Sequence, residues 1–282
     1  MIPSPTTAMP DLRGIRGWLF DLDGVLTPTA DVHMHAWARL FTPVLAAAGA
    51  EPYTDADYFA YIDGKPRYDG VRSLLASRGI VLPEGEVTDA PELDTVHGLG
   101  NRKNAAFNAT LAEEGVTAYP GSLAFLDAVQ HDGCLAAVVS SSKNAPAVLA
   151  AAGIADRFEV VVDGAVAARE GIAGKPAPDT YLAAAERLGL DPAVCAVVED
   201  AESGVRAGAA GPFGAVIGVD RGAGAETLLA LGADVVVHEL DELIPALGFE
   251  TRPPSSGAPR PAGGGPAGVH RPADSEREGG LA

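Results

Sequence analysis

Along most of this chain of 282 residues, short apolar runs alternate with segments whose apolar residues recur at helical spacing. From residue 119 onward, helical segments and apolar runs follow one another with short turns between them. Strands that alternate with single helices are typical of a parallel, doubly wound sheet. The pattern therefore predicts an α/β fold with strands at 135–139, 160–162, 196–198, 215–218 and 235–237. The helices predicted around them are 120–130, 145–152, 178–188, one that ends at 207, and 225–231.

An earlier apolar run, Trp18 to Phe20, predicts the first strand of the same sheet, and Gly24 ends it. Between this strand and residue 119 the periodicity is helical throughout. The expected helices begin near His33 and cover 55–61, 66–78 and 101–114, with a break at Gly98-Leu99-Gly100. A helical block of roughly 80 residues inserted after the first strand predicts a cap over that strand's carboxyl end. Caps of this kind exclude water from a reaction.

These patterns divide the chain into segments. Residues 1–10, with Pro3, Pro5 and Pro10, are expected to be a loose leader. We expect residues 11–32 and 115–250 to form the α/β core, and residues 33–114 to form the inserted helical cap. From residue 251 proline, glycine and serine dominate, which predicts a disordered tail over 251–282.

Composition narrows the classes of partner. The chain has 38 acidic residues against 20 lysines and arginines, a net charge of -18, which argues against binding nucleic acid or an anionic membrane surface. No secretory signal and no apolar stretch of membrane-spanning length is visible. The two cysteines, Cys134 and Cys195, lack metal-ligand spacing and are expected to be buried and reduced. We therefore expect a cytoplasmic protein, and we expect it to be a monomer.

Two carboxylates follow the first strand directly, in the run Asp21-Leu22-Asp23-Gly24. In an extended backbone, residues two apart point to the same side, so Asp21 and Asp23 can face one substrate while Leu22 enters the core. Open α/β sheets bind their ligands at the carboxyl ends of the strands. One carboxylate could then attack phosphorus while the other handles the proton. Two solvated aspartates in an ordinary turn would fit the same pattern.

Polar residues also follow three later strands. The run 140–144 begins with Ser140 and lies between a strand and a helix, where hydroxyls, amides and a lysine can bind a phosphate. Lys175 lies in a loop stiffened by two prolines, where it could neutralise charge that builds up on a phosphoryl group. Glu199 and Asp200 end a strand, and adjacent carboxylates suit Mg²⁺.

Each of these three clusters also has a simpler interpretation. The serines could cap a helix, the lysine could be solvated, and the adjacent acids could stabilise a helix start. However, all four strand-end clusters fall at one edge of one predicted sheet. Together they supply a nucleophile, a phosphate site, a charge-stabilising lysine and a magnesium pair, which favours a phosphoryl-transfer site.

In this order the clusters resemble the four motifs of the haloacid dehalogenase superfamily of phosphotransferases. The matching runs are Asp21-Leu22-Asp23-Gly24-Val25, Ser140 with the residues after it, Lys175-Pro176 and Glu199-Asp200. The resemblance covers about residues 15–250. Within the superfamily the chain is most similar to the β-phosphoglucomutase family. That narrower likeness rests on 29–37 with His33, 64–69 with Arg67, Ser142-Lys143-Asn144, and 175–179.

The resemblance implies a role for each matching residue. Asp21 would be phosphorylated, and Asp23 would be the general acid and base. Ser140 and Lys175 would hold the phosphoryl group in transfer. Magnesium would be bound by Asp21, the Asp23 carbonyl and Asp200, with Glu199 in support. The residues that match the family's ligands for the second phosphate are Arg67, Ser142, Lys143 and Asn144, and those that match its cap and hinge contacts are His33, Trp37 and Lys103.

The chain departs from the family pattern in two places. Pro28 stands where the pattern has an acid, which leaves the stiffness of the hinge and the sugar contacts open. The stretch 163–173, which precedes Lys175, is longer than expected. Neither departure removes a proposed catalytic group.

The resemblance favours a mutase that converts β-D-glucose 1-phosphate to glucose 6-phosphate through an aspartyl-phosphate and a bisphosphate. A sugar-phosphate phosphatase shares the first step and differs in that water accepts the phosphoryl group. The mutase needs a second phosphate site, and Arg67, Lys143 and Asn144 offer one. A non-catalytic regulatory protein on this fold is a third interpretation, since fold does not imply function. The complete set of predicted catalytic groups argues against it.

Overall fold

The computed structural model of the chain describes residues 10–248. The predicted tail at 251–282 and the predicted leader, apart from Pro10, lie outside the described residues. Within the described part, most predicted strands and helices are present, and their ends differ from the predictions by a few residues.

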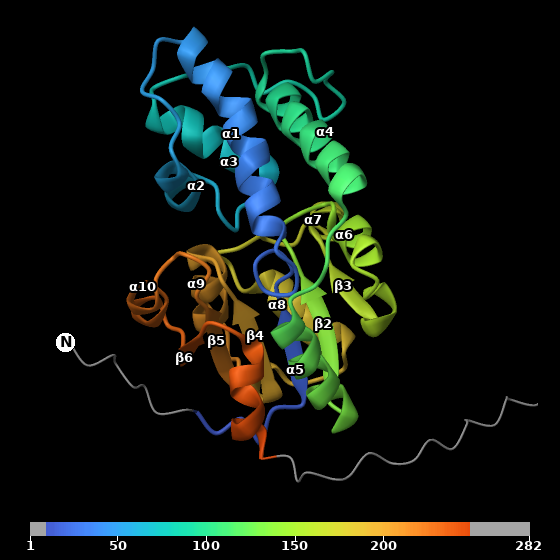
Figure 1. Ribbon diagram of the computed structural model, residues 1–282. Helices are drawn as coiled ribbons and strands as arrows, with labels where there is room; N and C mark the ends of the chain where they lie inside the picture. The colour runs from blue at the N-terminus through green and yellow to red at the C-terminus, as the bar shows by residue number, and fades with distance from the viewer. Residues whose placement is uncertain (1–9, 249–282) are drawn as a thin grey trace, which may run out of the picture. The chain divides into compact units, whose positions relative to one another are not determined.

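Six parallel strands form one sheet in the order β3-β2-β1-β4-β5-β6 (Figure 1). The strands are β1 (Gly17–Phe20), β2 (Leu135–Val139), β3 (Val160–Val162), β4 (Cys195–Glu199), β5 (Ala215–Val219) and β6 (Val235–Val237). The chain runs outward from β1 to β3 and then crosses back to β4, so the order reverses between β1 and β4. Doubly wound sheets bind ligands at such a switch point. The predicted α/β fold is confirmed.

The helices around the sheet are α5 (Pro120–His131), α6 (Ala145–Ala151), α7 (Gly164–Glu170), α8 (Asp179–Arg187), α9 (Glu202–Ala210) and α10 (Ala225–Ala230). Three 3-10 segments, η1 (Ala155–Arg157), η2 (Pro192–Val194) and η3 (Leu240–Leu247), complete this layer. Four of these elements, α7 and the three 3-10 segments, were not predicted. Helix α7 occupies the long stretch before Lys175, because the Asp163 side chain caps the amides of Ala165 and Val166 and Gly171 ends the helix at φ 67°.

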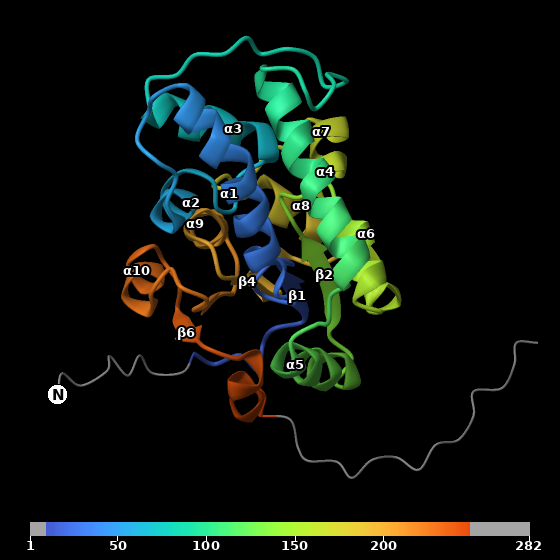
Figure 2. The same ribbon diagram turned by 45° about the horizontal axis from the view of Figure 1, so that its top comes forward.

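Four further helices lie over the carboxyl ends of the strands (Figures 1 and 2). They are α1 (Thr29–Ala47), α2 (Asp55–Tyr61), α3 (Arg67–Ser77) and α4 (Val96–Glu114), and no strand interrupts residues 29–114, all of which are described. Trp37, Phe41 and Leu74 belong to a hydrophobic cluster made only by these helices and the loops between them. Helix α1 begins four residues before His33, and the division into core and cap at 33 and 114 stays a prediction. No helix among residues 10–248 is long and apolar enough to cross a membrane.

The predicted break at Gly98-Leu99-Gly100 is wrong, because α4 continues through both glycines. A Cβ atom at Gly98 would lie 2.3 Å from the carbonyl oxygen of Leu93, and one at Gly100 would lie 2.6 Å from the ring of Tyr68. These glycines let a loop and an aromatic ring approach the helix closely. Tertiary packing, and not the end of a helix, explains them.

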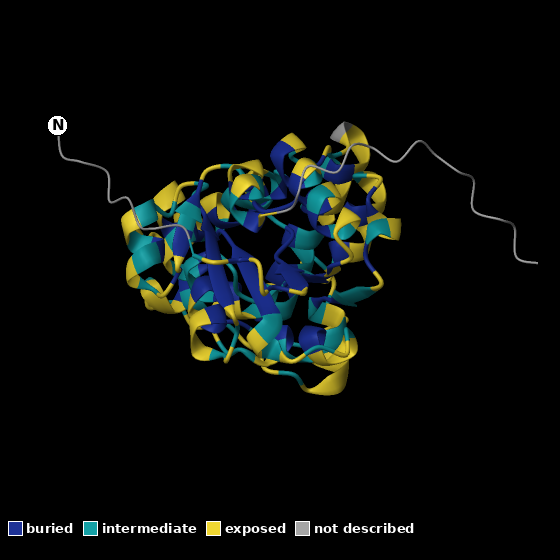
Figure 3. Ribbon diagram, turned by 90° about the horizontal axis from the view of Figure 1, so that it is seen from below, coloured by how far each residue is buried: buried dark blue, intermediate teal, exposed yellow. Residues whose placement is uncertain are grey.

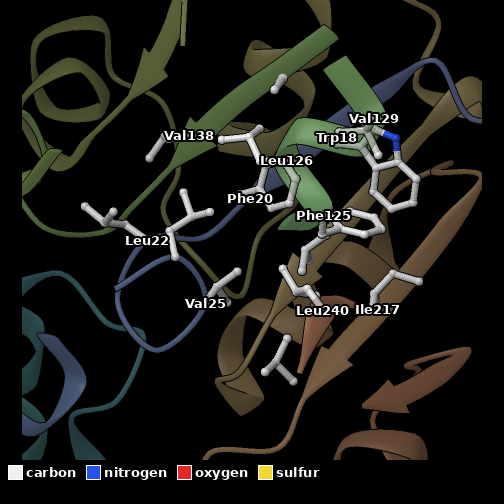
Figure 4. Packing of buried hydrophobic residues seen from close by; sticks show 14 of the residues in the cluster. Trp18, Phe20, Leu22, Val25, Phe125, Leu126, Val129, Val138, Ile217 and Leu240 are labelled. Carbon is white, nitrogen blue, oxygen red and sulfur yellow. The ribbon is translucent and has the colours of Figure 1, made fainter. Parts of the chain in front are cut away.

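Strand β1 is wholly buried at the centre of the sheet. Figure 4 shows Trp18 and Phe20 beside Phe125 of α5, and the Trp18 and Phe125 rings meet edge to face with centroids 4.8 Å apart. Leu19 packs into a second cluster on the opposite face. Figure 3 shows the strands in the buried colour, surrounded by helices with exposed outer turns. Because both faces of β1 are covered, its carboxyl end is held firmly in position.

Candidate active site

The turn after β1 is held by one glycine and by the neighbouring strand. The Asp21 amide still donates to the carbonyl of Val198 at 2.9 Å, so the first acid extends the ladder between β1 and β4. Gly24 then adopts φ 84°, a conformation that favours glycine. A Cβ atom at Gly24 would lie 1.8 Å from a carboxylate oxygen of Asp200. The glycine therefore lets the two strand ends bring their acids together.

Lys175 lies between two of these acids. Its ammonium is 2.5 Å from Asp21 and 2.5 Å from Glu199, and it also donates to the carbonyl of Val139 at 3.1 Å. Burial alone would lower the pKa of Lys175, but the two carboxylates outweigh burial and raise it. Lys175 is therefore a fixed cation next to the proposed nucleophile.

Glu199 is the second carboxylate that holds Lys175. Its carboxylate accepts hydrogen bonds from the Tyr181 hydroxyl at 2.8 Å and from the amides of Asp200 and Ala201. The side chain is fully buried, and a Cβ atom at Gly204 would lie 1.8 Å from it. Tyr181 was missed by sequence reasoning because nothing in the first turn of α8 distinguishes it from an ordinary core residue.

Asp23 points toward the cap. It accepts a hydrogen bond from Thr29 and lies 3.5 Å from the Ser140 hydroxyl and 3.5 Å from His33 Nε2. Burial alone would raise the pKa of Asp23, but His33 and Thr29 outweigh burial and lower it to about 2. Asp23 is therefore ionised and is held by partners on both sides. Thr29 was missed as a functional residue, although its position six residues after Asp23 is part of the motif region.

His33 and Lys103 form a pair on the cap side. Lys103 contacts His33 Nδ1, and its ammonium lies 5.1 Å above the Trp37 ring and 5.0 Å above the Phe107 ring. When Lys103 is protonated it can only donate, so His33 Nδ1 then accepts and the imidazole hydrogen is left on Nε2, on the side of Asp23. Burial lowers the pKa of both His33 and Lys103. The chain from Lys103 through His33 to Asp23 links α4 and α1 to the turn after β1.

Carboxylate oxygens of Asp21, Glu199 and Asp200 lie within 4.8 Å of one another. Burial raises the pKa of Asp21 and of Asp200, and neighbouring acids add to the effect. When its three carboxylates are ionised, the cluster has more negative charge than Lys175 alone can balance. An all-oxygen set with surplus negative charge fits Mg²⁺. The Asp23 side chain is not part of this cluster, and the sequence prediction assigned its carbonyl oxygen to the metal.

A second polar group lies where the cap meets the loop after β2. Arg67 of α3 and Asn144, which precedes α6, both donate to the side-chain oxygen of Asn104, at 2.7 and 2.8 Å. The Ser142 hydroxyl accepts a hydrogen bond from the backbone amide of Asn144 at 3.1 Å. Asn104 was missed by sequence reasoning because only the packing of α4 against α3 and the core brings it here.

These groups surround one cavity with a volume of about 70 Å³. The predicted site residues that line it are Asp21, Asp23, His33, Trp37, Arg67, Lys103, Ser140, Ser142, Glu199 and Asp200. Three predicted residues do not line it. Lys175 is paired with Asp21. Asn144 is linked through Asn104 to Arg67, which lines the cavity. Lys143 lines an adjoining cavity of about 270 Å³ together with Arg67.

Cap residues that were not predicted also line the cavity, among them Tyr58, Asp63 and Lys65. Burial, followed by the charge of Glu199, raises the pKa of Asp63 to about 7. The Ser141 hydroxyl donates to the carbonyl of Gly64 at 2.7 Å, and the Ser203 hydroxyl donates to that of Asp63 at 3.3 Å. These two bonds join the cap to the core beside the cavity.

Known proteins resemble this chain over most of its length. The family described as haloacid dehalogenase-like hydrolase matches residues 15–211. A β-phosphoglucomutase of Mycobacterium bovis is 48% identical over 241 residues, which cover 82% of this chain and 92% of that protein. Hexitol phosphatase A of Escherichia coli is 32% identical over 231 residues, 81% of this chain and 93% of that protein. A solved β-phosphoglucomutase from Clostridium difficile has a TM-score of 0.67 and 26% identity, over 81% of this chain and 93% of that one.

Proposed function

Because the chain belongs to the haloacid dehalogenase-like hydrolase family, we propose that it is a sugar-phosphate mutase, an isomerase of the β-phosphoglucomutase type. Its reaction would convert β-D-glucose 1-phosphate to glucose 6-phosphate. One observation carries the choice of a mutase. The cavity that contains Asp21 also contains Arg67, a cap cation held by the neutral side chain of Asn104. A bisphosphate intermediate needs such a second anion site.

Asp21 is the proposed nucleophile, and Asp23 moves the proton. In the first half of the cycle, phosphorylated Asp21 transfers its phosphoryl group to the sugar 6-hydroxyl while Asp23 takes the hydroxyl proton. The bisphosphate then reorients. Asp21 attacks the phosphorus at position 1, and Asp23 returns its proton to the oxygen that leaves. Because its pKa is low, Asp23 is ionised at the start of the cycle and can accept the hydroxyl proton.

Charge on the transferring group is balanced from the core. Lys175 is fixed against Asp21, and the Ser140 hydroxyl faces the same cavity. Asp21, Asp200 and the Asp23 carbonyl would hold Mg²⁺, with Glu199 in support. The ion, when bound, would neutralise negative charge on the phosphoryl oxygens. The surplus negative charge of the carboxylate cluster supports this assignment.

The cap would bind the distal phosphate and keep water away from the aspartyl-phosphate. Arg67 and Asn144 would donate to that phosphate, with Ser142 and Lys143 close by. His33, Lys103 and Trp37 would shape the wall next to the sugar. The bonds from Ser141 and Ser203 to the cap backbone support a closed cap in this state.

A sugar-phosphate phosphatase is the alternative, and the 32% identity to hexitol phosphatase A favours it. The experiment that separates the two supplies β-D-glucose 1-phosphate, Mg²⁺ and a trace of glucose 1,6-bisphosphate. A mutase forms glucose 6-phosphate in large excess over free phosphate. Free phosphate as the main product would identify a phosphatase. If neither product formed, the chain would be a binding protein without turnover.

A further inference from the structure

Two donors from different parts of the molecule converge on one amide oxygen. Arg67 belongs to the cap helix α3, and Asn144 belongs to the core loop before α6. Both donate to Oδ1 of Asn104 on α4, at 2.7 and 2.8 Å. These are the donors that the proposed function assigns to the distal phosphate. The oxygen of Asn104 thus has the two partners that a phosphate oxygen would have.

We propose that Asn104 is a positioning residue that keeps Arg67 and Asn144 converged until a phosphate oxygen replaces its own side-chain oxygen. The proposal rests on the proposed function, because it takes these two donors as the ligands of the distal phosphate. A neutral amide suits the task. It accepts hydrogen bonds well enough to orient both donors, yet a charged phosphate oxygen forms stronger bonds with the same groups.

Holding the donors in advance lowers the entropy lost when phosphate binds. A free arginine side chain has many rotamers, and fixing them at the moment of binding weakens affinity. Asn104 itself has a fixed place, because Lys103 beside it contacts His33 and lies over the Trp37 ring. Asn104 also joins the cap to the core through Asn144. The residue therefore couples closure of the cap to assembly of the anion site.

Three variants test this in the full chain. Asn104→Ala removes the acceptor, and Asn104→Asp keeps it but adds a negative charge. Asn101→Ala is the matched control. Asn101 lies almost one turn earlier on α4, accepts from the Tyr68 hydroxyl at 3.0 Å and donates to the carbonyls of Val87 and Asp89, all within the cap. The measurements are steady-state kinetics with β-D-glucose 1-phosphate, hydrolysis of acetyl phosphate, melting temperature, and calorimetric titration with glucose 6-phosphate and with inorganic phosphate.

For Asn104→Ala we expect KM to rise roughly fivefold, because the freed Arg67 side chain must then be ordered when the phosphate binds. For Asn104→Asp we expect a rise of roughly fiftyfold, because the new carboxylate pairs with Arg67 and repels the phosphate. The melting temperature should follow a different order, with Asp at or above the wild type and Ala below it. Hydrolysis of acetyl phosphate should be unchanged in both, and Asn101→Ala should lower only the melting temperature.

A purely structural role predicts instead that Asn104→Asp, which keeps the acceptor, binds sugar phosphate as well as the wild type does. That result would overturn the proposal, as would an unchanged KM in Asn104→Ala or a parallel loss of acetyl phosphate hydrolysis. The phosphate titration separates this failure from failure of the proposed function. If the wild type does not convert β-D-glucose 1-phosphate, the mutase fails, and the order of phosphate affinities across the variants still decides the role of Asn104.

Discussion

The two walls of the active cavity are built in different ways. On the core wall, four acids lie at strand ends, namely Asp21, Asp23, Glu199 and Asp200. Asp21 and Glu199 pair with Lys175, and Glu199 also accepts hydrogen bonds from two backbone amides. On the cap wall, the cations have neutral partners. Arg67 is held by Asn104, and Lys103 contacts an imidazole. Among the described residues of the cap, Asp63 alone brings an acid to the cavity.

Because of this difference, the two walls have different roles in the reaction. On the core wall, Lys175 is paired with Asp21 and Glu199, so these charges are in place for any phosphoryl group that reaches the wall. The side chains of Arg67 and Lys103 form no salt bridge with any residue of 10–248, so they remain available to an anion on the substrate. Changes in the core should therefore affect every reaction of the enzyme. Changes in the cap should affect only those reactions that use the second phosphate.

The largest effect is expected for Asp21→Asn. An amide cannot attack phosphorus, so we expect both conversion of β-D-glucose 1-phosphate and hydrolysis of acetyl phosphate to fall to background. The fold should persist, because Lys175 retains Glu199 as a partner. Mass spectrometry of the intact protein should show no phosphorylated species. A folded variant that still carries phosphate or turns over would remove Asp21 from its proposed role.

Arg67→Ala should separate the two walls. We expect conversion of β-D-glucose 1-phosphate to fall by roughly a hundredfold, or ~3 kcal/mol, which is the loss of a charge-assisted pair in a closed site. Acetyl phosphate has no second phosphate, so its hydrolysis should change little. Arg72→Ala on the same helix is the matched control, since Arg72 is exposed and pairs with Asp69 and Glu84 at the surface. Equal losses in both reactions would contradict the division between the walls.

Asp200→Asn should reduce affinity for Mg²⁺ at least tenfold, as an order-of-magnitude expectation for a lost carboxylate ligand. Saturation at a hundred times Kd stabilises a native state by about 2.7 kcal/mol, so Mg²⁺ should raise the melting temperature of the wild type. Without metal the variant should melt at or above the wild type, because burial and like charges raise the pKa of Asp200. The exposed Asp31 provides the control, Asp31→Asn. An unchanged Mg²⁺ titration in Asp200→Asn would remove this residue from the metal site.

The smallest effect concerns the stability of the cap. Burial alone would raise the pKa of Asp57, but hydrogen bonds from Arg78 and Thr54 outweigh burial and lower it. A depressed carboxyl pKa stabilises the fold above the ordinary value near 4, and this contribution is lost as pH falls through the native pKa. Asp57→Asn should therefore lower the free energy of unfolding by ~1–2 kcal/mol at pH 7, and by less below about pH 4. Urea titrations at both pH values measure the difference in free energy of unfolding between the wild type and the variant. A difference that grew at low pH would contradict the depressed pKa of Asp57.

The core wall was predictable from the positions of the strands, whereas the predicted cap residues were found only through the resemblance to a family. These cap residues are His33, Trp37, Arg67 and Lys103, and all four line the cavity. Asp21, Ser140 and Asp200 each follow a strand directly, and parallel strands align their ends at one edge of the sheet. The local sequence therefore determines that these three side chains lie close together. Asn104 meets Arg67, and Asp63 reaches the cavity, only through the packing of the cap helices, which no periodicity reports. The glycines of α4 were misread for the same reason, since packing and not local propensity explains them.

Helix α7 was also not predicted, because it is short. Its start and end signals, Asp163 and Gly171, stand in the sequence, but the segment between them spans only seven residues. Seven residues make about two turns, too few for a periodic pattern to distinguish from a loop. The helix lines the cavity beside Arg67 and Lys143, so the stretch that departs from the family pattern lies next to the proposed distal-phosphate site.

The central claim is that the core wall forms the phosphoryl-enzyme and the cap wall directs the phosphoryl group to a sugar hydroxyl instead of water. The most direct measurement runs the reaction of the wild type with β-D-glucose 1-phosphate, Mg²⁺ and a trace of glucose 1,6-bisphosphate in water enriched in oxygen-18. We predict glucose 6-phosphate as the main product, with unlabelled phosphate oxygens and almost no labelled inorganic phosphate. Labelled inorganic phosphate formed in step with consumption of the substrate would show that water is the acceptor and would contradict the account.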